Sequence, residues 1–154
     1  MKPGARSDEI YEQIDWSVLV MFAGLFVVVH AFGQHVMARW DLAAWPPLAG
    51  APLVVLTLLA TGLSNLVSNV PAVLLFSPVV PLLATPDTAW LALAMSSTLA
   101  GNLTLLGSVA NLIVAEGARR EGVEVSFAEY CRVGIPVTVL TLVLGTGWLS
   151  LVTR

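Results

Sequence analysis

The chain has 154 residues, of which 57% are hydrophobic and only 11% are charged, and its mean hydropathy is +0.86. Soluble domains carry about 25% charged residues, so this composition predicts an integral membrane protein with the lipid bilayer as a partner. The net charge of −3 and the lack of a lysine- or arginine-rich segment exclude a nucleic-acid partner. The single cysteine, Cys131, excludes an intrachain disulfide and a metal site of several thiolates.

The first membrane span is expected at residues 15–32, a nearly continuous apolar run in which Trp16 suits an interfacial anchor. Residues 1–14 carry both signs of charge and lack the pattern of a cleaved signal, so we expect a retained cytoplasmic segment. Residues 34–45 mix charged, aromatic and aliphatic side chains. That mixture predicts a short helix lying in the membrane interface.

A re-entrant helical hairpin is predicted for residues 50–84. Residues 42–86 hold no charged side chain, yet the run 64–71, Ser-Asn-Leu-Val-Ser-Asn-Val-Pro, interrupts them with polar groups. The apolar arms on either side have 13 or 14 residues, whereas a spanning helix needs about 20. The polar run therefore predicts a hairpin tip near the membrane midplane, where irregular backbone must be buried in protein or line a cavity.

The rest of the chain predicts a broken membrane helix at 88–116, an interfacial segment at 117–132 and a final span at 133–152. The stretch 101–108, Gly-Asn-Leu-Thr-Leu-Leu-Gly-Ser, separates the two apolar pieces of the broken helix. With the N-terminus in the cytoplasm, five basic residues lie inside and two outside. The positive-inside rule favours this orientation, with the C-terminus outside the cell membrane.

Both polar interruptions offer groups that could bind ions, because a broken helix leaves about four N–H and four C=O groups unpaired. Asn69 is expected to cap the second hairpin arm with Pro71 in its first turn, so that free amides form an anion site. Gly101 is expected to end the first half-helix with positive φ, and Ser108 to cap the next half-helix. Between them, carbonyl and side-chain oxygens of 102–104 form a candidate sodium site.

The runs 64–75 and 100–116 closely resemble the signature stretches of the ion transporter superfamily, and most of all its arsenite-pump, anion-permease and citrate-transporter-like group. The resemblance extends to the opening run 15–26 and so covers nearly the whole chain. It implies an all-α integral membrane fold, the second inverted repeat of a permease, with one re-entrant hairpin and one broken transmembrane helix. It also implies the C-terminal half or a fragment of a secondary transporter that moves an inorganic or small organic anion, coupled to sodium or protons.

The resemblance further implies the site residues and the partners. The matched hairpin tip and loop assign seven residues to the substrate: Ser68, Asn69, Val70, Pro71, Thr104, Gly107 and Ser108. Eight residues are assigned to the ion: Ser64, Asn65, Ser68, Asn69, Gly101, Asn102, Thr104 and Asn111. Because family members have two inverted repeats, the expected partners are the small anion, an N-terminal repeat on the same or a separate chain, and a second copy of the full transporter. No cofactor is expected beyond a sodium ion.

Three other functions would each require features that can be looked for in the sequence. A sodium/proton exchanger would need a buried carboxylate, and the predicted spans carry acidic residues only at their ends, Asp15 and Glu116. A channel of asparagine-capped half-helices would carry Asn-Pro-Ala, whereas Val70 separates Asn69 from Pro71. An intramembrane enzyme lacks a Ser–His pair or an acidic cluster at membrane depth, so no enzymatic activity is expected. The exchanger and the channel remain the alternatives to an anion transporter.

Overall fold

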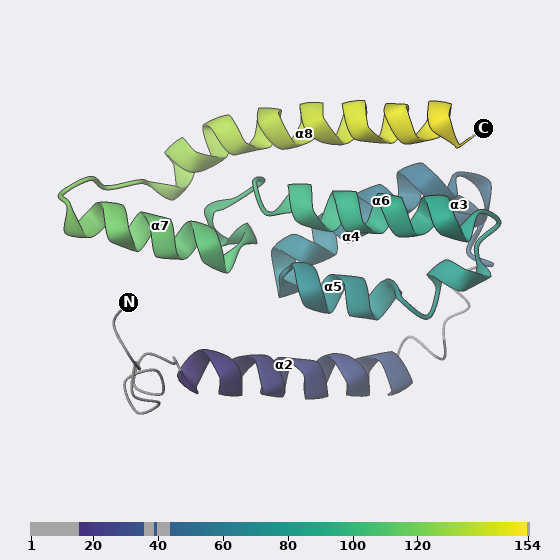
Figure 1. Ribbon diagram of the computed structural model, residues 1–154, viewed down its shortest axis with the longest axis horizontal. Coiled ribbons are helices and arrows are strands. Elements are labelled where there is room, and N and C mark those ends of the chain that lie inside the picture. The colour runs from purple at the N-terminus through teal and green to yellow at the C-terminus, as the bar shows by residue number, and fades with distance from the viewer. Residues whose placement is uncertain (1–15, 36–38, 40–43, 154) are drawn as a thin grey trace, which may run out of the picture.

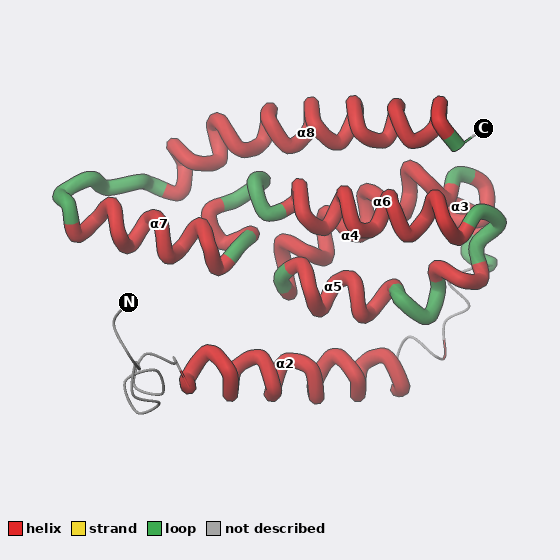
Figure 2. The backbone as a smooth tube through the Cα atoms, viewed as in Figure 1, coloured by secondary structure: helices red, strands yellow, loops and turns green. Residues whose placement is uncertain are grey.

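The structure is a computed structural model that describes residues 16–35, 39 and 44–153 (Figure 1). In this part of the chain all regular secondary structure is helical and no strand occurs (Figure 2). The elements are α2 (Trp16–His35), α3 (Pro46–Gly50), α4 (Pro52–Val67), α5 (Asn69–Phe76), η2 (Val80–Leu82), α6 (Pro86–Ala100), η3 (Leu105–Gly107), α7 (Val109–Arg120) and α8 (Phe127–Val152). The predicted segment 1–14 and most of the predicted interfacial helix at 34–45 lie outside the described residues.

The longer helices lie roughly along the long axis of the molecule (Figure 1). Helices α4 and α5 form a hairpin in which α5 runs back alongside α4, and α6 packs against both arms. Helix α2 packs on α5, whereas α8 packs on α6 and α4 on the opposite side of the molecule. Helix α7 continues the direction of α6 beyond the end of the hairpin, so that α6 and α7 together cross the molecule in one direction.

Prolines set the starts of several of these helices. Helices α3, α4 and α6 each have a proline in the first or second helical position. The missing N–H of proline costs nothing there, because the first amides of a helix have no intrahelical acceptor. The base of the hairpin is therefore built from short connections between helices that start at prolines.

The hydrophobic core lies at the base of the hairpin, away from its tip. Its buried members come from α3, both hairpin arms, the turn after α5 and the start of α6: Leu48, Leu56, Ala60, Phe76, Val79, Val80, Leu83, Ala89 and Leu93. Close packing of small and branched side chains holds such helices together when the surroundings are as apolar as the core. The tip lies beyond this core, where polar contacts take over.

Helix α8 is the one described helix that is long and apolar enough to cross a membrane by itself. Its outward face is a continuous apolar surface that includes Leu140, Leu144, Trp148 and Leu151, all more than half exposed. Exposing an apolar face of this size to water would be energetically unfavourable in a soluble protein. It suits contact with lipid.

The helix ends between 116 and 133 differ from the boundaries drawn on the sequence. Helix α7 continues to Arg120 and ends in a turn at Gly122, which has a φ of 82°. Helix α8 begins at Phe127, within the predicted interfacial segment 117–132. A capping box explains the early start, because the side chain of Ser126 accepts from the amide of Glu129 while the Glu129 carboxylate accepts from the amide of Ser126.

Candidate functional site

The hairpin tip is a single residue between two helices. Helix α4 ends at Val67, α5 begins at Asn69, and Ser68 between them has φ 77° and ψ 163°. Among the described residues other than glycine, Ser68 alone has a positive φ. This backbone region is essentially confined to glycine, and a residue with a side chain pays about 1–3 kcal/mol to occupy it. The surrounding contacts must therefore hold the tip in this conformation.

The prediction that Asn69 caps α5 is wrong. Ser68 occupies the N-cap position, because its carbonyl already accepts the first helical bond from the amide of Ala72 at 3.2 Å. No side chain caps α5. Pro71 lies in the first turn of α5 as predicted, and it is buried. The amides of Asn69 and Val70 consequently have no hydrogen-bond acceptor among the described residues.

Two buried side-chain oxygens near the tip also lack partners among the described residues. They are the Oγ of Ser64, a fully buried residue of α4, and the Oδ1 of Asn69. The hydroxyls of Thr57 and Thr138 are buried and unpartnered as well, but they lie further along α4 and α8. Most buried polar groups in proteins are hydrogen-bonded, so the two free oxygens beside the strained tip are exceptions.

The second polar interruption separates α6 from α7. Ser108 is the N-cap of α7 as predicted, and its Oγ accepts from the amide of Ala110 at 3.2 Å. Gly101 ends α6, but its φ is −57°, so the predicted positive φ is wrong. The reason is that the chain continues past α6 in 3-10 turns, in which each amide bonds to the carbonyl three positions earlier. The amides of Gly101, Asn102 and Leu103 bond in this way to the carbonyls of Thr98, Leu99 and Ala100, respectively. We call residues 101–104 the loop.

Asn65 joins the hairpin tip to this loop. Its Nδ2 donates to the carbonyl of Ala100 at 2.9 Å and to the carbonyl of Thr61 in its own helix at 3.1 Å. Its Oδ1 accepts from the Thr104 hydroxyl at 3.0 Å. Gly107 lies so close that a Cβ there would be 2.7 Å from the same Oδ1. One neutral side chain thus spans the two breaks, and both its donor hydrogens are used.

Asn111, on α7, holds the loop from the other end. Its Nδ2 donates to the carbonyl of Gly101 at 2.7 Å and to that of Thr104 at 3.4 Å. The carbonyls of Asn102 and Leu103 instead lie against α8 at Gly134, where a Cβ would meet both oxygens. The loop carbonyls expected to bind sodium therefore face different partners, and Asn102 itself is exposed.

The structure brings half of the predicted site residues together. Asn65, Thr104, Gly107, Gly101 and Asn111 share the contacts described above, and Asn69 approaches through its Nδ2, 3.7 Å from the position of a Gly101 Cβ. Val70, in contrast, is about half exposed. Sequence reasoning missed Gly134, whose signal was a glycine just ahead of Pro136 in an otherwise apolar helix.

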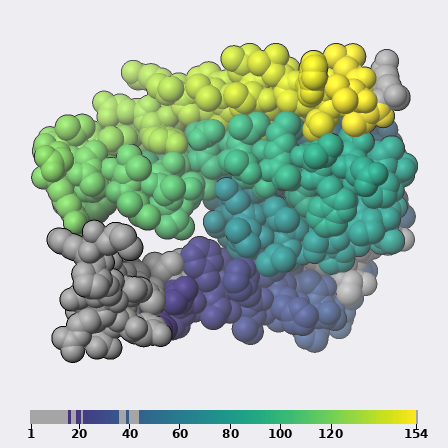
Figure 3. All heavy atoms as spheres, in the orientation of Figure 1, coloured from purple at the N-terminus to yellow at the C-terminus, as the bar shows by residue number. Residues whose placement is uncertain are grey.

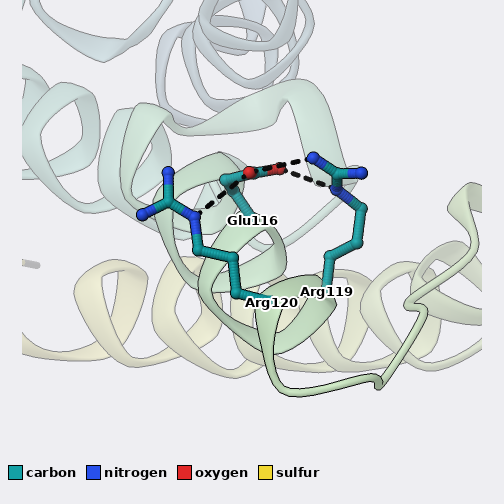
Figure 4. Close-up of polar contacts among 3 residues, drawn as sticks. All are labelled: Glu116, Arg119 and Arg120. Atoms are coloured by element: carbon teal, nitrogen blue, oxygen red, sulfur yellow. Dashed lines mark hydrogen bonds and ion pairs between the residues drawn. The ribbon is translucent and has the colours of Figure 1, made fainter.

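The charged groups lie away from this site. Glu116 pairs with Arg119 at 2.9 Å and with Arg120 at 3.3 Å near the far end of α7 (Figure 4). These are the ion pairs found within the described ranges; the two arginine side chains are largely exposed and that of Glu116 is partly exposed. The bond to Glu116 raises the pKa of the Arg119 guanidinium. No cluster of three or more potential metal ligands occurs in the described chain.

Comparison with protein families matches residues 3–100 to the citrate transporter family. A putative transporter arsB of Dictyostelium discoideum is 42% identical over 144 residues, which are 89% of this chain and 25% of that protein. The silicon efflux transporter LSI3 of Oryza sativa is 38% identical over 149 residues, 87% of this chain and 30% of that protein. A 46 kDa membrane protein of Mycobacterium leprae is 35% identical over 150 residues, 90% of this chain and 35% of that protein.

The chain thus spans between a quarter and slightly more than a third of the length of these curated relatives. No solved structure shows a significant match to it.

Proposed function

Because the chain belongs to the citrate transporter family, we propose that it is the C-terminal half, or a part of it, of a secondary transporter that moves a small anion with ion coupling. The family and the names of its relatives indicate a membrane transporter and not an enzyme. In such a transporter this chain would supply part of the binding site for the anion and the coupling ion. We assign the site to the hairpin tip and the loop.

The proposal rests on the hydrogen bonds by which Asn65 joins the two polar interruptions. Its bonds to Ala100 and Thr104 join residues 35 and 39 positions away in the sequence. Two broken helices that meet in this way expose helix ends to a common point, which is how secondary transporters build sites without charged side chains. The buried, unpartnered oxygens of Ser64 and Asn69 lie on the same hairpin.

The tip offers groups for a substrate and for an ion. The free amides of Asn69 and Val70, at the positive end of the α5 dipole, suit a small anion. The unpartnered Oγ of Ser64 and Oδ1 of Asn69 are oxygen ligands of the kind that hard cations such as sodium prefer. An anion and a cation bound side by side would partly neutralise each other, which favours coupled transport over separate binding.

The arrangement of the helices supports a re-entrant hairpin. Its base and the C-terminal end of α8 lie at the same end of the molecule, and its tip lies partway along the length of α8 (Figure 1). If α8 spans the bilayer, the tip is held within the membrane and does not cross it. We further propose that the N-terminus is cytoplasmic and the C-terminus lies outside the cell membrane.

The test is Asn69→Ala in a full-length transporter that contains this segment, reconstituted in liposomes. Radiolabelled citrate is the first probe, with sulfate and phosphate in parallel, and an imposed sodium or proton gradient drives uptake. We expect kcat/KM to fall by about 30-fold or more, since a lost ligand or unpaired buried group costs about 2–3 kcal/mol. Uphill accumulation of the probe separates a transporter from the channel alternative.

Ser77→Ala is the matched control, because Ser77 follows the other end of α5 and its hydroxyl donates to the carbonyl of Leu74. This variant should transport at the wild-type rate. Equal rates for both variants, with equal amounts of protein inserted, would refute the assignment of Asn69 to the site.

A further inference from the structure

Helix α8 touches the loop at a glycine. Gly134 is buried, and a Cβ built there would overlap the carbonyl oxygen of Asn102 and lie 3.1 Å from that of Leu103. The ring of Tyr130, one turn earlier in α8, would be 3.3 Å away. These obstacles include two backbone oxygens, which can move only if the loop or the helix moves.

The absence of a side chain is what allows this approach. In glycine, a hydrogen on Cα occupies the direction of the missing Cβ, so it points at the carbonyl of Asn102. Contacts of this kind between Cα–H and carbonyl oxygen recur where helices pack closely. The backbone of α8 therefore packs directly against the backbone of the loop.

Residues on three helices, α4, α7 and α8, thus contact the loop. Asn65 binds its start through Ala100 and its end through Thr104, Asn111 binds the carbonyls of Gly101 and Thr104, and α8 bears on the carbonyls between them. Backbone packed this tightly moves as a unit, so pressure on the middle of the loop is transmitted to its ends. The hydrogen bond between Thr104 and Asn65 is the contact nearest to the tip that such a shift would lengthen.

We propose that Gly134 is a positioning residue that fixes the loop against the hairpin tip and thereby sets the affinity of the site. The inference rests on the proposed function, since it assigns a role to α8 in the same site. Gly134 touches neither substrate nor ion. It acts through the backbone of Asn102 and Leu103.

Helix α8 contains its own control series. A Cβ at Gly147 would meet nothing within 4 Å, whereas one at Gly145 would meet the side chain of Met95 on α6. Gly147→Ala therefore isolates the gain in helix propensity, which is the same for all three alanine variants. Gly145→Ala adds pressure between α6 and α8 against a flexible side chain, away from the loop. Only Gly134→Ala presses on the loop itself.

The experiment has two measurements on the same three alanine variants. Hydrogen–deuterium exchange of this chain in nanodiscs reports on the peptide covering the loop, with the start of α6 as an internal reference. Uptake of citrate and its dependence on sodium, measured in the full-length transporter, report KM and kcat separately. For Gly134→Ala we expect about tenfold faster loop exchange and an about tenfold higher KM, with kcat changed much less. Gly145→Ala and Gly147→Ala should match the wild type in both.

The outcomes separate this inference from the proposed function. Equal loop exchange in the three variants would overturn the positioning role, as would a Gly134→Ala protein that fails to fold, because residue 134 would then support the fold and not the site. Faster loop exchange with an unchanged KM would also overturn it, since the loop would not set affinity. If the wild-type transporter moves none of the probes, the proposed function fails, whereas the exchange comparison still decides whether Gly134 holds the loop.

Discussion

Asn65 shows how one uncharged residue can organise the interior of this protein. Its amide group accepts from the Thr104 hydroxyl and donates to carbonyls at the end of α6 and in its own helix. If the site lies within the membrane, as proposed, no water replaces the lost acceptor of the Thr104 hydroxyl in a mutant, whereas the carbonyl of Ala100 keeps the amide of Leu103 as a donor. Asparagine suits this position because it offers two donors and an acceptor on a short side chain.

Removing the Asn65 side chain should destabilise the protein more than the loss of one hydrogen bond would suggest. We expect Asn65→Ala to lower the free energy of unfolding by about 2 kcal/mol, because it leaves the Thr104 hydroxyl without an acceptor and removes one donor each from the carbonyls of Ala100 and Thr61. A double-mutant cycle with Thr104→Val should give a coupling energy of about 0.6 kcal/mol, the average for hydrogen bonds between membrane helices. Unfolding in mixed micelles by titration with SDS measures both quantities.

Thr98→Val is the control for this cycle. Thr98 is exposed, and its hydroxyl donates to the carbonyl of Ala94 in its own helix. Combined with Asn65→Ala it should give additive effects, within about 0.3 kcal/mol. A coupling with Thr98 as large as that with Thr104 would show that the Asn65–Thr104 bond has no specific role.

At the scale of whole elements, the two interrupted segments have different geometries. The hairpin reverses direction at Ser68, with helices ending and beginning on either side of a single residue. The second interruption keeps its direction, so α6 and α7 begin and end at opposite ends of the molecule (Figure 1). Of the two segments, only the second runs from one end of the molecule to the other, and we expect it to cross the membrane with the loop in its middle.

This geometry makes a prediction about topology. Asp87, in the first turn of α6, should lie outside the cell, and Arg120, at the end of α7, should lie in the cytoplasm. Single cysteines at these positions, in a Cys131→Ser background, can be treated with a membrane-impermeant thiol reagent on intact cells. We expect labelling at position 87 and protection at position 120 until the cells are permeabilised.

The reverse labelling pattern would invert the proposed orientation, and labelling of both positions on intact cells would contradict a crossing by α6 and α7. A cysteine at Ala84, an exposed residue at the end of the predicted hairpin, serves as a second outside marker. It should label together with position 87, because the hairpin base and the start of α6 lie at the same end of the molecule (Figure 1).

For the molecule as a whole, the outer helices have few buried side chains. Helix α7 has no buried residue, and in α2 Val29 is the one buried side chain among those described. In the space-filling view a hollow separates α7 from α2 beside the hairpin tip (Figure 3). Apolar helices this exposed have lipid or further protein as their partner. The relatives are three to four times longer than the segment they share with this chain, so they hold further protein for this role.

We therefore expect this chain by itself to insert into membranes without transporting. A site at the junction of two repeats needs groups from both repeats. Without the other repeat, the tip amides of this chain would form only one side of the site. The measurement is sodium-dependent citrate uptake into liposomes that contain this chain, beside liposomes with a full-length transporter. Saturable uptake by this chain alone would contradict the need for a second repeat and would favour a functional assembly of identical copies.

Several features of this protein can be predicted from its sequence because they depend on local chemistry. The membrane class, the helical fold, the position of both interruptions, the place of Pro71 and the cap at Ser108 all follow from composition and from the behaviour of backbone next to proline, serine and glycine. These properties depend on a few neighbouring residues, so a pattern can reveal them. The N-cap of α5 shows the limit of this reasoning, because the local pattern favoured Asn69 whereas the cap lies at Ser68.

Only the tertiary structure decided which residues join the interruptions. Asn65 and not Asn69 clamps the loop, Gly101 keeps a right-handed conformation, and Gly134 admits α8 to the carbonyl of Asn102. Two of these depend on segments more than 30 positions apart, Asn65 with Ala100 and Gly134 with Asn102, whereas the conformation of Gly101 belongs to the tight turns that follow α6. No local pattern records such a distance, because it is set by how the helices pack as complete bodies and by which carbonyls that packing leaves in need of a donor.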